Sequence, residues 1–457
     1  MKISQVQNLL ASWKKLTSLS VNRRIFSAAI LVGLLTGFVK LTAFIKELLV
    51  AWKFGTGDAI DAFLIALVVP SFIFNVLADS SLSASFIPNY IKVLEKEGKK
   101  KAQKLLSEVL ASALGLLVIS VVVIVATAPF YLSWIAAGFD NQKLDLTFNL
   151  LCIIASVIIL DTVIVVGSAV LNAKESFALA ALSPILTPGI TILFLLQFDK
   201  WGVFALSAGL ISGAVLQILI LGIALNRQKI SLIPKLPGFD THLRQTIRQY
   251  LPAVAGGFLI CSSGIVDQSM AAMLSPGSVA SLTYGYRVIA SPIGLISTAL
   301  TTAIIPYFSK MIACQDWRDL YRSTKRCIQL IFLSLFPVMG LMLLFSESIV
   351  RFVFQRGSFT AEDTHLVAEI QACYALKIPF FIANILLLKL IIMLRENHIL
   401  IWITTLNLIL NITFNYVFMQ WIGIQGIALS TSCGYIFSFV FMLLFTRKKI
   451  KHRILNA

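Results

Sequence analysis

Charge is scarce in this sequence, and acidic charge is scarcer still. Only 13% of the 457 residues are charged while 58% are hydrophobic, and 21 acidic residues stand against 38 lysines and arginines. Mean hydropathy is +0.89. One water-soluble core cannot hide that much apolar surface, so the composition excludes an ordinary soluble protein.

Patterns for catalysis and metal binding are also missing. The six cysteines form no C-x-x-C, the four histidines form no H-E-x-x-H, and neither a phosphate-binding glycine loop nor G-x-S-x-G occurs. The sequence therefore predicts no metal site, no cofactor and no catalytic residue, and so a protein that is not an enzyme. A membrane glycosyl-transfer enzyme is a weaker alternative, for which Glu362 and Asp363 are the only acidic pair expected near an outer loop.

Long apolar runs fill most of the chain. A run of about 20 apolar residues is long enough for a helix to cross a bilayer. Such runs occur near 27–51, 60–87, 106–132, 147–171, 178–197, 203–225, 250–274, 280–307, 327–350, 366–394, 399–419 and 423–446. The fold class predicted is an all-α polytopic membrane protein with about twelve transmembrane helices in two six-helix bundles around a central cavity.

The positive charges are distributed very unevenly between the two sides that these spans define. Of the 38 lysines and arginines, 28 lie in segments on the side of the termini, and only Lys53, Lys143, Lys200, Arg351 and Arg356 lie on the other. Because basic loops stay in the cytoplasm, both termini are predicted to be cytoplasmic. The basic charge is then explained by topology, and no nucleic-acid partner is expected.

The two halves of the chain show a weak similarity at a shift of roughly 220 residues. Trp201–Ser207 is similar to Ile422–Ser430, and Pro70 corresponds to Pro292. Duplication is favoured over chance similarity among apolar segments, which stays open. The predicted units are a cytoplasmic N-terminal segment (1–26), a first six-helix bundle (27–225), a cytoplasmic linker (226–249), a second six-helix bundle (250–446) and a basic cytoplasmic tail (447–457).

Cations within the spans are the first candidates for function, because a charged group in the hydrocarbon costs roughly 2.5–3.5 kcal/mol to insert. Lys40 and Lys46 lie in the first span and Arg287 in the eighth. From opposite halves they could clamp a phosphate or pyrophosphate headgroup. Internal salt bridges are the alternative. Lys377 and Lys389, in the tenth span, are expected to extend toward the membrane surface.

Acidic residues within the spans are candidates for binding a coupling ion or for pairing with the cations. They are Glu47, two helical turns from Lys40, together with Asp61, Asp161 and Asp267. Asp161 and Asp267 either bind a coupling cation or proton or neutralise the lysines. Asn407, Asn411 and Asn415 form a polar stripe on the eleventh span, for which hydrogen bonding between helices is the favoured interpretation.

Several segments resemble the MurJ/MviN lipid II flippases of the multidrug/oligosaccharidyl-lipid/polysaccharide exporter superfamily. The resemblance runs through most of the chain. It is carried by Gly37–Lys40 with Phe44–Glu47, Phe54–Gly57 with Asp61–Phe63, Ser83–Pro88, Gly277–Val279 with Tyr286–Arg287, and Phe354–Thr360.

The resemblance implies transport of an undecaprenyl-pyrophosphate-linked saccharide from the cytoplasmic to the periplasmic leaflet of a bacterial inner membrane, for peptidoglycan or another surface polysaccharide. It implies that Lys40, Lys46 and Arg287 face the cavity and that Asp61 matches an acid at the start of the second span. Transport would use the membrane potential or an ion gradient. The partners would be the lipid-linked substrate and the bilayer. Proteins of envelope-polysaccharide synthesis are candidates for further partners.

The sequence departs from the family pattern at several positions. Lys40 and Lys46 stand where arginine is usual, Phe74 and Asn75 replace a basic pair, and Asp79–Ser80 replaces an acid–glycine pair. Members commonly carry two further spans after the last one found here. An O-antigen or exopolysaccharide flippase and a MATE-like small-molecule antiporter therefore remain as alternatives.

Overall fold

The computed structural model describes residues 21–174, 176–234, 238 and 241–455, and within them every regular element is a helix. The elements are α2 (Val21–Phe54), α3 (Asp58–Phe74), the π-helix η1 (Asn75–Asp79), α4 (Ser80–Glu97), α5 (Lys99–Ile135), α6 (Asn141–Ala155), α7 (Val157–Ala173), α8 (Phe177–Leu182), the 3₁₀ turn η2 (Ser183–Ile185), α9 (Leu186–Gln197), the 3₁₀ turn η3 (Asp199–Trp201), α10 (Phe204–Arg227), α11 (Thr241–Ala272), α12 (Ser278–Ala313), α13 (Trp317–Leu344), α14 (Ser346–Phe354), α15 (Ala361–Ala375), α16 (Ile378–Met393), α17 (His398–Ile422) and α18 (Ile424–Leu455).

The all-α polytopic membrane fold predicted from the apolar runs is confirmed. Among the described residues, nine helices are long and apolar enough to cross a membrane, and a tenth candidate is the bent pair α15 and α16. The other two runs expected from the sequence fall on α2 and α12, which contain 34 and 36 residues. At 1.5 Å per residue both helices exceed the thickness of the hydrocarbon layer.

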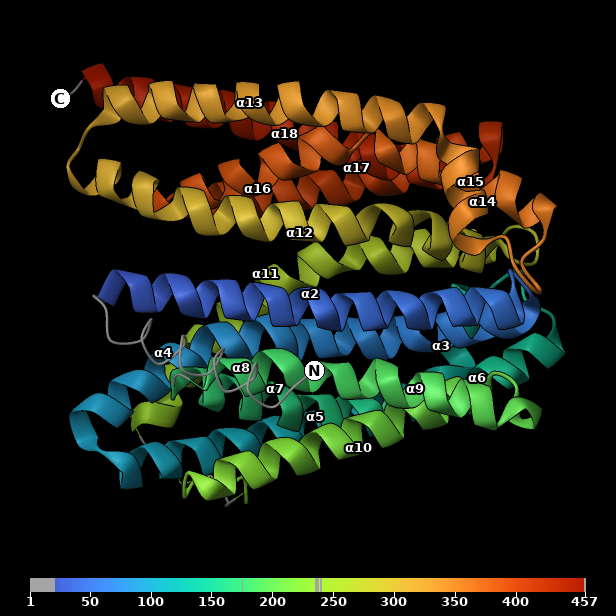
Figure 1. The fold of residues 1–457 in the computed structure, drawn as a ribbon, viewed down its shortest axis with the longest axis horizontal. Coiled ribbons are helices and arrows are strands. Elements are labelled where there is room, and N and C mark those ends of the chain that lie inside the picture. Colours follow the sequence, from blue (N-terminus) through green and yellow to red (C-terminus); the bar gives the residue numbers. More distant parts are fainter. Residues whose placement is uncertain (1–20, 175, 235–237, 239–240, 456–457) are drawn as a thin grey trace, which may run out of the picture.

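The long helices lie roughly side by side, with α2 to α10 on one side of the molecule and α12 to α18 on the other (Figure 1). The first residue of α2 and the last of α18 lie at the same end of the bundle (Figure 1). We call this the terminal end and the opposite one the far end. The α2 and α12 helices meet where the two sides face each other.

The α11 helix packs against both sides. Near its start, the Tyr250 hydroxyl donates a hydrogen bond to the Leu77 carbonyl at 2.7 Å, and α11 packs against α3, α4 and α5. Further along, α11 packs against α17. The helix that was expected to open the second bundle thus connects the two sides of the molecule.

Three of the expected spans are interrupted near a proline. The fifth is divided by the turn η2 beside Pro184, and the tenth bends by 41° between α15 and α16, next to Pro379. In the second span, the π-helix η1 follows Pro70, whose ring removes one backbone donor from the helix. By contrast, α12 continues through Pro292 as one helix.

Two glycines allow α9 and α10 to pack closely. A Cβ atom at Gly209 would lie 2.6 Å from the Cα of Thr191, and one at Gly213 would lie 2.6 Å from the Cα of Thr187. Without side chains at these positions the two backbones approach each other directly, which is the usual role of small residues between membrane helices.

Candidate functional site

Three of the predicted site residues meet between α2 and α12. The Lys46 Nζ lies 2.6 Å from one carboxylate oxygen of Glu47, and the Arg287 guanidinium pairs with the other. Between 12% and 30% of each of these side chains is exposed. Glu47 therefore holds one cation from its own helix and one from the opposite side of the molecule. The ion pairs weighed in the sequence analysis are present, and they gather the cations in one place.

Lys40 belongs to the same contact, two helical turns from Glu47. Its Nζ lies so close to Gly294 that a Cβ there would be 2.9 Å away. Lys40 comes seven residues before Glu47 on α2, whereas its neighbour Gly294 comes seven residues after Arg287 on α12. The two helices therefore run antiparallel, with their charged faces in register. We call Lys40, Lys46, Glu47 and Arg287 the α2–α12 charge cluster.

Asp61 serves a different purpose at the far end. One of its oxygens accepts a hydrogen bond from the Gly277 N–H at 2.7 Å, and the other accepts one from the Ala280 N–H at 2.8 Å. These donors belong to the first turn of α12, whose N–H groups have no partners within the helix. A carboxylate there also interacts favourably with the helix dipole. Asp61, on α3, thus caps α12 across the interface between the two sides.

Lys143 on α6 holds the Asp61 carboxylate in place. Its Nζ donates to Asp61 at 2.9 Å and to Asp58 at 2.6 Å, and it lies 4.0 Å from the centre of the Phe139 ring. Asp61 is 1% exposed, and Lys143 is 8% exposed. A buried carboxylate requires this compensation because its charge has lost its hydration.

Further contacts join the two sides at the far end. The Ser358 N–H donates to the Trp52 carbonyl at 2.8 Å, and the Ser358 hydroxyl donates to the Lys53 carbonyl at 3.0 Å. The Thr56 hydroxyl donates to Asp363. At Gly277, where φ is +84°, a Cβ would overlap the Thr56 carbonyl oxygen. The far end is therefore closed by backbone contacts that leave no room for added side chains.

The remaining predicted acids lie apart from the charge cluster. Asp161 is on α7, half-buried, and no hydrogen bond or ion pair joins its carboxylate to another described residue. Asp267 is on α11 and accepts hydrogen bonds from the side chains of Asn411, Asn415 and Thr431. The predicted hydrogen bonding between helices is thereby confirmed for Asn411 and Asn415. Asp161 and Asp267 do not share one site.

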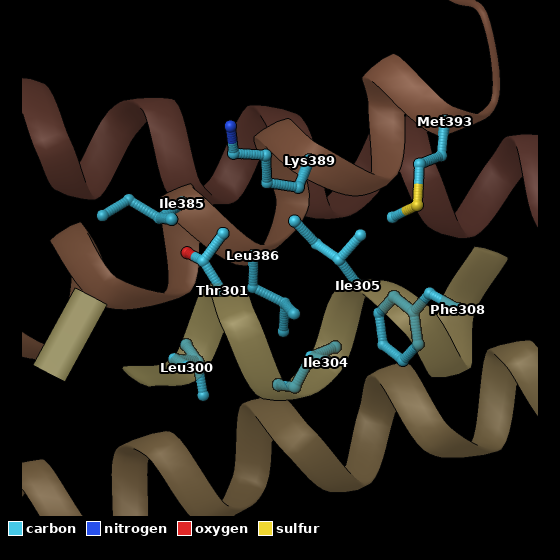
Figure 2. A pocket seen from close by; sticks show the side chains of 9 residues that line it. All are labelled: Leu300, Thr301, Ile304, Ile305, Phe308, Ile385, Leu386, Lys389 and Met393. Carbon is cyan, nitrogen blue, oxygen red and sulfur yellow. The ribbon is translucent and has the colours of Figure 1, made fainter. Parts of the chain in front are cut away.

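The two lysines of the tenth span differ from each other. Lys389 on α16 lines a small apolar pocket against α12, and its ammonium points away from Ile304 and Phe308 (Figure 2). Lys377 is 2% exposed, so its expected extension to the membrane surface is wrong. The bend between α15 and α16 turns its side chain inward instead.

Sequence reasoning missed the roles of Asp58 and Lys143 because the ion pairs that they form link positions 85 and 82 residues apart. One signal was present, since Lys143 is one of only five cations assigned to the outer side. A cation retained on that side is more informative than one among the many on the other.

Comparisons with known proteins agree on one family. The family model described as "Lipid II flippase MurJ" matches residues 50–457. A probable lipid II flippase MurJ of Synechocystis sp. is 25% identical over 444 residues, covering 92% of this chain and 82% of that protein. One from Thermotoga maritima is 28% identical over 412 residues, covering 90% of this chain and 83% of its own length.

Solved structures show the same fold. A lipid II flippase MurJ in an inward closed conformation superposes with a TM-score of 0.79 at 22% identity, covering 93% of this chain and 90% of that one. An inward-facing MATE family transporter gives 0.76 at 15% identity, covering 94% and 99%. An outward-facing MATE structure gives 0.62 at 15% identity, covering 93% and 96%. With a family model that matches most of its length, this chain belongs to the lipid II flippase MurJ family.

Proposed function

We propose that this protein moves an undecaprenyl-pyrophosphate-linked saccharide, lipid II or a related carrier-linked unit, from the cytoplasmic to the periplasmic leaflet by alternating access. The α2–α12 charge cluster carries this proposal. Its three cations and one carboxylate leave two net positive charges between the two sides of the molecule. A pyrophosphate diester carries two negative charges, so the charges of site and ligand match.

The position of the cluster between the two sides supports an affinity for pyrophosphate that changes during transport. Lys40 and Lys46 come from α2, whereas Arg287 comes from α12 on the other side. When the two sides rock against each other, the distance between these cations changes, and the pyrophosphate can be held in one state and released in the other. A guanidinium can grip a phosphate with two parallel hydrogen bonds, while the two ammonium groups supply charge.

In the proposed topology the terminal end lies in the cytoplasm, with both termini on that side. The excess of lysine and arginine there supports this orientation. The far end, closed by Asp61 and its partners, then faces the periplasm of a bacterial inner membrane. Residues 27–225 and 250–446 would move as the two bundles, with α11 as the helix that connects them. Glu47 and Asp61 act as charge partners. Asp161 and Asp267 remain proposed coupling groups for an ion gradient or the membrane potential.

The first test is rescue of a bacterium depleted of its own lipid II flippase, followed by growth and by periplasmic delivery of labelled lipid II. We expect the wild-type chain to rescue growth and Arg287→Glu to abolish delivery while still inserting in the membrane. Arg287→Lys should retain part of the activity because it keeps the charge.

Lys389→Glu is the control, since it reverses a charge within a span outside the charge cluster, beside Ile304 and Phe308 near the opposite end of α12 from Arg287. Full delivery by Arg287→Glu would refute the pyrophosphate clamp. Failure of the wild-type chain despite membrane expression, combined with uptake of another undecaprenyl-pyrophosphate saccharide in proteoliposomes, would assign it to a surface polysaccharide other than peptidoglycan.

A further inference from the structure

A pocket of about 140 Å³ lies between α13, α16 and α18 near the terminal end of the molecule. The three helices pack against one another, and α13 begins at the end where α18 finishes (Figure 1). The lining therefore comes from the first turns of α13 and the last turns of α18, together with Leu387 of α16. We call this the α13–α18 pocket. It lies apart from the α2–α12 charge cluster, because neither α2 nor α12 lines it.

The pocket is polar toward the terminal end and apolar further inside. Lys325 precedes Ile328 by three residues on α13, and Arg447 follows Leu443 by four residues on α18. On each helix a cation therefore lies about one turn closer to the terminal end than an apolar residue of the same pocket. This order, charge outside and hydrocarbon inside, matches that of a membrane phospholipid.

The two cations of the pocket are not neutralised. None of the described lining residues is acidic, and no ion pair joins Lys325 or Arg447 to a described carboxylate. Other cations at the terminal end do have such partners, since Lys449 lies 2.6 Å from Glu396 and Arg322 lies 3.6 Å from Asp319. The α13–α18 pocket thus keeps two positive charges available for an anion that is not part of the chain.

A buried hydroxyl in the same pocket has no partner. Thr446 is 1% exposed, and its Oγ1 makes no hydrogen bond with the described residues. Thr324, which lines the opposite wall, instead donates to the Leu320 carbonyl at 2.8 Å. A hydroxyl buried without a partner has lost its hydration with nothing gained in return. A ligand with an acceptor oxygen would satisfy it.

Tyr321 offers a further donor at the outer part of the pocket. The Arg447 guanidinium donates a hydrogen bond to the Tyr321 hydroxyl oxygen at 3.4 Å, so the hydrogen of that hydroxyl stays available. Guanidinium, ammonium and hydroxyl groups are the donors that bind phosphate oxygens most strongly. Cations beside a membrane span also attract anionic lipids.

We propose that the α13–α18 pocket binds the phosphodiester headgroup of an anionic phospholipid, phosphatidylglycerol, in the leaflet at the terminal end. Lys325 and Arg447 pair with the phosphate, Thr446 donates a hydrogen bond to it, and an acyl chain extends along Ile328 and Leu443. The bound lipid joins the start of α13 to the end of α18 and so stabilises the second side of the molecule. This inference does not rest on the proposed transport function.

The experiment measures thermal unfolding of the purified protein in detergent micelles with added phosphatidylglycerol or phosphatidylcholine, at equal lipid content and ionic strength. A ligand that binds only the folded state raises the unfolding temperature. Wild type should unfold a few degrees higher in phosphatidylglycerol. Lys325→Gln combined with Arg447→Gln should lose most of this difference.

The matched control removes two charges from the same helices outside the pocket. Arg326 and Lys448 are the exposed neighbours of Lys325 and Arg447 in the chain, and neither lines the pocket. Arg326→Gln combined with Lys448→Gln should therefore keep the difference between the two lipids. Equal losses in both double variants would overturn the proposal, because general surface charge would then attract the lipid.

Thr446→Val tests the pocket without any change of charge. Valine has nearly the shape of threonine, and the hydroxyl that it replaces has no partner, so this variant should be at least as stable as wild type in phosphatidylcholine. In phosphatidylglycerol it should lose part of the stabilisation, and Thr446→Ser should keep it. A full response in Thr446→Val would place the headgroup outside this pocket, even if the charge variants fail to fold.

Two further outcomes decide between sources of the anion. Equal unfolding temperatures of wild type in the two lipids would refute binding of the anionic headgroup. Inorganic phosphate, added in phosphatidylcholine micelles, should have little effect because it has no acyl chain to fill the apolar part. A response to phosphate as large as that to phosphatidylglycerol would assign the pocket to a soluble anion instead. None of these measurements uses a lipid-linked saccharide.

Discussion

The carboxylate of Glu47 on α2 pairs with the guanidinium of Arg287 on α12, joining the first long helix of the chain to the helix that faces it from the other side. The same carboxylate binds Lys46 at 2.6 Å. Glu47 is therefore the anion that allows two intramembrane cations to lie close together.

Replacement of Glu47 by glutamine should disorder this contact. Lys46 and Arg287 would lose their shared anion, and we expect the free energy of unfolding to fall by about 1–3 kcal/mol, the usual cost of leaving a partly buried polar partner unmet. Delivery of lipid II should fall more than tenfold. Glu47→Asp, which keeps the charge, is the control. Thermal unfolding together with a proteoliposome assay measures both effects, and equal activity of Glu47→Gln and wild type would contradict this role.

Replacement of Asp61 by asparagine should weaken the cap on α12 and favour opening of the far end. Loss of the carboxylate removes the charge that holds the Gly277 and Ala280 N–H groups, and loss of an N-cap costs about 0.5–2 kcal/mol. Since the cap exists only when the far end is closed, the population should shift toward a state open at that end. Spin labels at Gln142 and Glu362, both exposed, would report the opening as a longer distance.

Asp58→Asn is the matched control for that experiment. Asp58 also binds Lys143 but makes no contact with the first turn of α12 among the described residues. We expect a smaller shift than for Asp61→Asn. Identical distance distributions in wild type and Asp61→Asn would rule out the cap as a determinant of closure.

Replacement of Gly138 by alanine should hinder closure of the far end by a steric clash. A Cβ there would overlap the carbonyl oxygen of Ala272, the last residue of α11. Alanine should therefore disfavour the closed far end without disturbing either side alone. Gly115→Ala on α5 is the control, because nothing lies within 4 Å of a Cβ at that position. The same pair of spin labels measures the result, and a closed state retained in Gly138→Ala would mean that the contact yields.

Glu396 gives a prediction on pH. It lies between α16 and α17, where a hydrogen bond from Lys449 at 2.6 Å lowers the pKa of its carboxyl below the ordinary value, with further contributions from His398 and Arg453. A lowered pKa stabilises the folded protein above the pKa of the unfolded chain, near 4.3, and this stabilisation is lost as pH falls through the lowered value. Thermal unfolding of Glu396→Gln should accordingly differ from wild type at neutral pH and approach it in acid.

Local composition was sufficient to predict the membrane helices. A run of about twenty apolar residues indicates a transmembrane helix, because a helix satisfies all of its own backbone hydrogen bonds and this length matches the thickness of the bilayer. Lys40, Lys46 and Arg287 could be selected for a similar reason, since a charge within a span has a high cost wherever the helix is placed.

Only the tertiary structure decided which side chains pair with each of these charged residues. Arg287 could have paired with any of several acids, and nothing in the spacing shows that Glu47 would hold it. Asp61 meets the first turn of α12 more than 200 residues away in the chain, and Lys377 faces inward because the bend between α15 and α16 directs it there. Hydrophobic periodicity determines where a helix begins and ends, whereas the register between two helices depends on side chains from both, which no single segment contains.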